Sequence, residues 1–167
     1  MGATNDAGGA LHGTVFRGVN HLALDAKGRL AIPARHREPL AGPVSGGTHS
    51  GGLVLTADAS QCLLLYPRAL WEPIQARLMA LSSFDAPIRN LQRLLVGHAD
   101  DVEMDGAGRI LVPPALRQYA ALEHRVVLVG QGNKFELWDE ARWTAQTARA
   151  VAFPDGALPP ELTGFSL

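Results

Sequence analysis

Few features of this sequence suit a secreted or membrane-bound protein. It has one cysteine, Cys62, which cannot form an intrachain disulfide and lies in an apolar run where a buried structural thiol is expected. Its longest apolar runs, Cys62–Tyr66 and Val126–Val129, are far too short to cross a bilayer. The N-terminus lacks the basic segment followed by an apolar segment that is typical of a secretory signal. We therefore expect a cytoplasmic protein with no membrane partner.

The sequence also lacks the residue combinations that catalysis requires. Ser45 and Ser50 lie among glycines, but neither completes a Gly-x-Ser-x-Gly elbow, and this stretch has no Gly-Lys-Ser/Thr phosphate loop. The histidines, at positions 12, 21, 36, 49, 98 and 124, show no metal-ligand spacing to one another or to Cys62. We expect no enzyme activity, no metal, no cofactor and no small-molecule substrate.

Net charge is small as well, at −1. The basic residues are concentrated, however, because the segment Phe16–Leu40 carries a net charge of +3 and leaves −4 for the rest. A local basic face on a nearly neutral protein suits limited contact with phosphate groups better than the coating of nucleic acid. At this point a solvated charged surface without a partner is the alternative.

What the sequence does contain is an internal repeat. The segment Asn20–Arg37 resembles Asp100–Arg117, eighty positions later. The matched residues are Asp25, Gly28, Arg29, Pro33 and Arg37 against Asp105, Gly108, Arg109, Pro113 and Arg117. Farther along, Leu65-Tyr66 matches Leu137-Trp138 at a shift of 72, so the first copy is longer. Its extra residues fall most naturally in the Gly-rich stretch Ala41–Gly52.

Each copy predicts the order strand, tight turn, strand, short helix, strand, turn, strand, longer helix. Leu22 and Leu24 alternate with Ala23, as in a half-buried strand. Asp25–Gly28 predicts a turn, because aspartate can bond the nearby backbone and glycine tolerates positive φ. Other elements are expected at Val126–Trp138 (a hairpin), Leu70–Leu81 (a helix with Pro73 in its first turn) and Asp139–Ala150 (a helix).

Neither copy can bury a core alone, so the other copy is the expected partner. We predict an α+β fold of two tandem hairpin and helix repeats related by a pseudo-twofold axis. The expected divisions are a flexible extension at 1–15, a first repeat at 16–81, a linker segment at 82–98, a second repeat at 99–150 and a tail at 151–167.

Over roughly residues 16–150 the chain resembles the MraZ family of bacterial transcription regulators. The motifs that carry the resemblance are Phe16-Arg17-Gly18, Asp25-x-x-x-Arg29, Asp105-x-x-x-Arg109, Leu94–Ala99 and Asn133–Trp138. The resemblance implies an AbrB-like swapped-hairpin barrel and a ring-like homo-oligomer. It also implies binding of double-stranded DNA, at repeated boxes upstream of the division and cell-wall gene cluster, by a nucleoid-associated protein. The residues before Phe16 and the long loop at 41–52 depart from the family pattern.

Basic side chains at the two turns are the candidate DNA contacts. Arg29 and Arg109 lie at matching turn exits, where a guanidinium can offer two donors to guanine O6 and N7. Lys27 suits a phosphate contact as a point charge. The second copy has Ala107 in its place, so the two turns are expected to differ. Further phosphate contacts are expected from Arg17 and Arg35.

The acidic residues of the turns need another role, because Asp25 and Asp105 cannot bind phosphate. We interpret them as holding the turns, together with Gly28 and Gly108, and as orienting the arginines through charge-assisted hydrogen bonds. The alternative is that aspartate and arginine merely close a hairpin. For Arg37 and its counterpart in the second copy, a phosphate contact and an internal salt bridge both remain open.

A protein-interaction module is the rival function, because swapped-hairpin domains also occur in antitoxins that neutralise a partner protein. Such proteins usually carry an extended partner-binding tail. Here the stretch Phe153–Leu167 is short and rich in proline and glycine. Binding of a promoter fragment from the protein's own operon would discriminate between the two functions.

Overall fold

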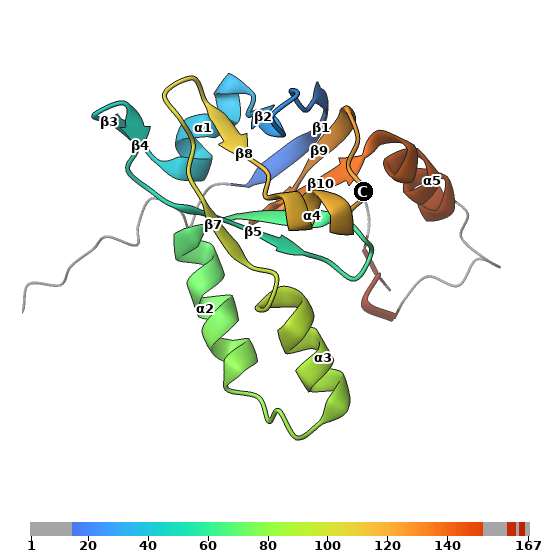
Figure 1. Cartoon of the computed structure of the whole chain (residues 1–167). Coiled ribbons are helices and arrows are strands. Elements are labelled where there is room, and N and C mark those ends of the chain that lie inside the picture. Colours follow the sequence, from blue (N-terminus) through green and yellow to red (C-terminus); the bar gives the residue numbers. More distant parts are fainter. Residues whose placement is uncertain (1–14, 152–159, 163, 166–167) are drawn as a thin grey trace, which may run out of the picture.

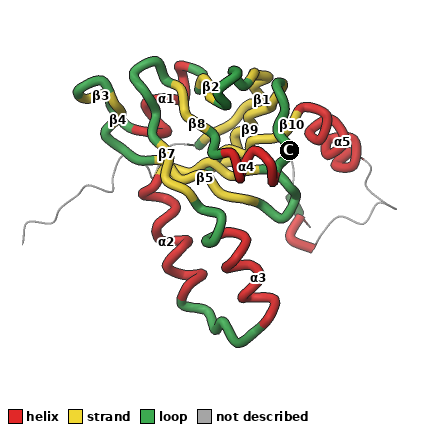
Figure 2. The backbone as a smooth tube through the Cα atoms, in the orientation of Figure 1, coloured by secondary structure: helices red, strands yellow, loops and turns green. Residues whose placement is uncertain are grey.

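The computed structural model describes residues 15–151, 160–162, 164 and 165 (Figure 1). The expected N-terminal extension, apart from Val15, and most of the expected C-terminal tail lie outside the described residues. Figure 2 shows a mixture of helices and strands, and all strand pairs are antiparallel. The predicted α+β class is therefore confirmed.

The predicted order of elements occurs twice along the chain. The first repeat contains β1 (Phe16–Ala23), β2 (Arg29–Ala31), α1 (Ala34–Ala41), β3 (Val44–Ser45), β4 (Thr48–His49), β5 (Leu53–Ala57), β6 (Leu63–Pro67) and α2 (Arg68–Met79). After α3 (Ala86–Leu95), the second repeat contains β7 (Asp100–Val102), β8 (Arg109–Leu111), α4 (Pro114–Tyr119), β9 (Arg125–Gly132), β10 (Phe135–Asp139) and α5 (Glu140–Val151). A short 3-10 helix, Pro160–Leu162, follows.

Strands of the two repeats are interleaved. The main sheet has the order β1-β9-β10-β6-β5-β7, so β1 pairs with a strand of the second repeat and β7 with a strand of the first. A separate two-stranded ribbon joins β2 to β8, again one strand from each repeat. Within the described residues the main sheet is open, with β1 and β7 at its edges. The expected closed barrel is therefore wrong.

The central strands β5 and β6 of the main sheet are buried on both faces. Alternate residues of β5 and β6 contribute to two separate cores, which explains why both strands are apolar throughout rather than alternating. On one face Leu55 and Leu65 pack with Leu30 and Ile110 of the β2–β8 ribbon. On the other face the core includes aromatic side chains from β6, α2, β10 and α5, namely Tyr66, Trp71, Trp138 and Trp143. Figure 1 shows the ribbon and α1 on one side of the sheet and α2 and α3 on the other.

Three segments differ from the sequence-based expectation. Helix α2 begins at Arg68 rather than Leu70, so Pro73 lies inside the helix and not in its first turn. The Gly-rich insertion forms the β3–β4 hairpin. The linker forms α3, and the buried Gln92 ties it to α2 through bonds from its Nε2 to backbone carbonyls of Leu78 and Leu81. No described helix is long and apolar enough to cross a membrane.

Candidate nucleic-acid interface

The turn between β1 and β2 is organised by the carboxylate of Asp25. Its Oδ1 accepts hydrogen bonds from the backbone N–H groups of Lys27 and Arg29, both at 2.9 Å, and its Oδ2 accepts one from Nε of Arg29 at 2.7 Å. The Gly28 N–H donates to the Asp25 carbonyl at 2.9 Å, and Gly28 has a φ of 79°. A glycine is required there because side chains strongly disfavour this left-handed conformation.

The turn between β7 and β8 has the same geometry. Asp105 Oδ1 accepts from the backbone N–H groups of Ala107 and Arg109 at 2.9 Å, and Oδ2 accepts from Nε of Arg109 at 2.9 Å. Gly108 has a φ of 77°. In both turns Nε–H is the only group of the arginine side chain that donates to the aspartate. The terminal NH2 groups of Arg29 and Arg109 have no hydrogen bond to any described residue, so they remain available to an external acceptor.

Hydrogen bonding lowers the pKa of both carboxyl groups. For Asp25 the largest cause is the backbone N–H of Arg29, and the Arg29 side chain and the Lys27 N–H add to it. For Asp105 the largest cause is the backbone N–H of Arg109. Both aspartates are therefore ionised at neutral pH, and each guanidinium is held by a charged partner. A charge-assisted bond of this kind restricts the arginine to one orientation.

The register of the ribbon places both arginines on one face. Arg29 pairs with Leu111, Leu30 with Ile110, and Ala31 with Arg109. Because side chains alternate along a strand, Leu30 and Ile110 face the core, where both are fully buried. The arginines therefore share the outer face as diagonal neighbours, at a separation of about 7–8 Å. Figure 1 shows this ribbon on the side of the molecule away from α2 and α3.

Not all predicted DNA contacts lie together. Lys27 is exposed at the tip of the first turn, beside Arg29. Arg35 lies instead over β1, where its Nη2 donates to Asn20 Oδ1 at 2.8 Å. Arg17 is exposed near the start of β1, about 20 Å along the strand from the turn at about 3.4 Å per residue. The structure thus brings Arg29 and Arg109 together on the ribbon, with Lys27 at the end nearer Arg29, and it places Arg17 and Arg35 elsewhere.

For Arg37 and Arg117 the sequence allowed either a phosphate contact or an internal salt bridge. In the structure each of these arginines packs against one of the two turns. Arg37, in the first repeat, lies against Gly108, and Arg117, in the second, lies against Gly28. Arg37 also donates from Nε to the carbonyl of Ile32 at 2.7 Å. Neither arginine forms an ion pair with a described residue. Both the turn glycine and the arginine recur in the two copies, and this recurrence was a sequence signal for the contact. Each repeat supplies the arginine that packs against the turn glycine of the other repeat.

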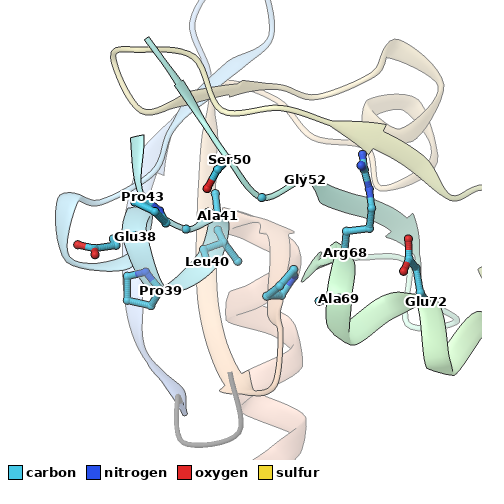
Figure 3. A pocket seen from close by; sticks show the side chains of 13 residues that line it. Glu38, Pro39, Leu40, Ala41, Pro43, Ser50, Gly52, Arg68, Ala69 and Glu72 are labelled. Atoms are coloured by element: carbon cyan, nitrogen blue, oxygen red, sulfur yellow. The ribbon is translucent and has the colours of Figure 1, made fainter. Parts of the chain in front are cut away.

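A cavity of about 640 Å³ lies apart from the ribbon, between the end of α1 and the start of α2. Figure 3 shows Glu38 and Pro39 on one side of it and Arg68 and Glu72 on the other. Arg68 already pairs with Asp101, with 3.1 Å between Nη2 and Oδ1. Among its described lining residues Ser50 is the only hydroxyl group, and no histidine is present.

No group of three or more potential metal-ligating side chains occurs in the part of the chain that the structure describes.

Comparison with known proteins agrees with the repeat. The model of the MraZ protein family, described as antitoxin-like, matches residues 15–94 and again residues 95–157. A protein of Nitrosospira multiformis named transcriptional regulator MraZ is 58% identical over 153 residues, which cover 92% of this chain and all of that protein. Proteins of the same name from Nitrosomonas eutropha and Thiobacillus denitrificans are 55% and 56% identical, with the same coverage.

Proposed function

Since this chain belongs to the MraZ family, whose curated relatives are named transcriptional regulators, we propose that it regulates transcription by binding double-stranded DNA through the outer face of the β2–β8 ribbon. The observation that carries the proposal is the pair of arginines on this face, each held by its own aspartate. A two-stranded ribbon fits the major groove of B-DNA, which is about 12 Å wide. In this arrangement Arg29 and Arg109 read guanine edges, each discriminating by about 1–3 kcal/mol.

Phosphate contacts complete the proposed interface. Lys27 is exposed at the end of the ribbon, where a point charge suits the backbone of the groove that the ribbon enters. Arg17 and Arg35 lie along β1, so they would contact phosphate groups outside that stretch of groove. Asp25 and Asp105 position the arginines and do not touch the DNA themselves.

The proposed fold family is the AbrB-like swapped hairpin. Four strand pairings between the repeats support it: β1 pairs with β9, β5 with β7, β2 with β8, and β6 with β10. In this proposal the first repeat (16–81) and the second (99–150), joined by the segment 82–98, act as one DNA-binding unit.

Binding through an assembly is also part of the proposal. One ribbon contacts only a few base pairs, whereas linked copies on repeated boxes gain about 10²–10⁴ in avidity. We therefore propose a ring-like homo-oligomer on repeated boxes in the promoter of its own division and cell-wall gene cluster, in a cytoplasmic, nucleoid-associated protein. Exposed apolar side chains at the α2–α3 tip support assembly, because such groups are commonly buried in interfaces; they are Met79, Leu81 and Phe84.

An antitoxin-like protein-interaction module is the second candidate, favoured by the description of the matched family. A gel-shift titration separates the two functions. DNA upstream of the protein's own gene and a shuffled fragment of equal length and composition are compared at fixed salt. Preferential binding of the upstream fragment supports the regulator. Equal binding of both fragments, or none, contradicts it.

A further inference from the structure

Leu111 is an apolar side chain on the face that carries the two arginines. It is 53% exposed, whereas its neighbours Ile110 and Val112 are fully buried. The register sets Leu111 directly opposite Arg29. Burial in the core therefore does not account for an apolar residue at this position. A molecule bound to the outer face of the ribbon would cover Leu111.

The hydrogen bonds of the ribbon define how close Leu111 and Arg29 stand. Bonds run from the Ile32 N–H to the Gly108 carbonyl at 2.9 Å and from the Val112 N–H to the Gly28 carbonyl at 3.0 Å. The pair Arg29–Leu111 lies between bonded positions, so it is a non-hydrogen-bonded pair, with about 4.5 Å between Cα atoms. That spacing is close to one base step, about 3.4 Å along the helix axis.

In the major groove, the apolar group that can receive such a side chain is the 5-methyl of thymine. Cytosine presents an amino donor at its groove edge, and a leucine over it would remove water without offering an acceptor. We propose that Leu111 is a specificity-determining residue that packs on a thymine 5-methyl within one or two base steps of the base contacted by Arg29. This assignment rests on the proposed function.

The matching position in the first repeat is different. Ala31 stands opposite Arg109, as Leu111 stands opposite Arg29, but it presents a single methyl group. The tips of the two turns also differ, with Lys27 in the first turn and Ala107 in the second. The backbone of the ribbon has pseudo-twofold symmetry, whereas its outer face does not. The outer face of one ribbon therefore lacks the twofold symmetry that palindromic sites mirror.

A double-mutant cycle between protein and DNA tests the contact. Footprinting on the upstream fragment first defines a bound box. Each thymine of the box is then replaced singly by deoxyuridine, which removes only the 5-methyl group. With the wild-type protein, one replacement weakens binding about fourfold, as expected for one buried methyl group. With Leu111→Ala, the same replacement has no further effect, and all other thymines behave alike in both proteins.

Leu111→Met is the matched variant, because it keeps an apolar side chain of similar reach; it restores the response to deoxyuridine. Circular dichroism and size-exclusion profiles that match wild type establish that both variants fold. Equal responses of wild type and Leu111→Ala at every thymine would overturn the role of Leu111 while leaving the proposed function standing. Absence of preferential binding by wild type would overturn the proposed function and the assignment with it.

Discussion

Arg117, in the second repeat, packs its guanidinium against Gly28, in the first. A β-carbon built on Gly28 would lie 2.5 Å from Nη1 of Arg117, well inside van der Waals contact. The reciprocal contact joins Arg37 to Gly108. Each of the two turns is thus packed against an arginine of the opposite repeat, so the integrity of one turn depends on both copies.

Gly28→Ala should therefore destabilise the protein by more than its backbone conformation alone requires. The left-handed conformation costs about 1–2 kcal/mol for alanine, and displacement of Arg117 brings the total to about 2–4 kcal/mol. Gly132→Ala is the matched control, because Gly132 has a φ of 80° and a β-carbon added there would meet no neighbouring atom within 4 Å. Urea unfolding of both variants measures the difference.

The same comparison in an Arg117→Ala background isolates the contact. There, Gly28→Ala should cost no more than Gly132→Ala, because the obstructing guanidinium is gone. An undiminished cost in this background would show that the Arg117 contact contributes nothing.

Stability should fall in acid through the two turn aspartates. Hydrogen bonds lower the pKa of Asp25 and Asp105 in the folded protein, so their contribution is fully present above the unfolded pKa of about 3.9 and is lost as pH falls through the folded pKa. The double variant Asp25→Asn, Asp105→Asn should lose less stability than wild type below about pH 4. Chemical unfolding measured from about pH 7 down to about pH 2.5 follows the loss of stability as pH falls below the unfolded pKa. Parallel curves for the two proteins would refute the prediction.

The salt dependence of DNA binding should depend on Lys27. If Lys27 contacts one phosphate, Lys27→Ala lowers the magnitude of the log–log slope of affinity against salt by about 0.9. Lys134→Ala is the control, because Lys134 lies over the ring of Tyr66, with 5.8 Å from Nζ to the ring centroid, away from the ribbon. Fluorescence anisotropy at several salt concentrations gives the slopes. A slope unchanged in Lys27→Ala would remove Lys27 from the interface.

Cys62 should be unreactive in the folded protein. It is fully buried, and burial, followed by the charges of Glu136 and Asp58, raises the pKa of its thiol. Because the thiolate is the reactive form, a thiol reagent at about pH 8, near the ordinary thiol pKa, should modify Cys62 only as fast as the protein opens. Rapid modification of the native protein, relative to the protein in urea, would contradict this burial.

Local signals in the sequence were enough to predict the turns and the order of elements. Asp25 and Gly28 form their turn through contacts within five residues, and the same signals recur at Asp105 and Gly108. The β9–β10 hairpin is likewise local. The buried thiol at Cys62 follows from its apolar run.

Partner choice between distant strands could not be predicted in the same way. The pairing of β1 with β9 joins residues more than a hundred positions apart, and hydrophobic alternation does not name a partner. Barrel closure depends on whether β1 and β7 meet, which no local pattern decides. The separation of Arg17 and Arg35 from the turn could not be predicted either, because it depends on tertiary packing. Both side chains lie along β1 rather than at the turn.

We propose that Arg29 and Arg109 read DNA from the outer face of the β2–β8 ribbon. The most direct test is an affinity titration of wild type, Arg29→Ala and Arg109→Ala on upstream fragments with one box or several, with size-exclusion profiles as a control for folding and assembly. Specific binding should be lost in Arg29→Ala and weakened in Arg109→Ala, while wild type binds several boxes far more tightly than one. Wild-type affinity in Arg29→Ala, or equal affinity of wild type for one box and for several, would contradict DNA reading by these arginines in an assembly.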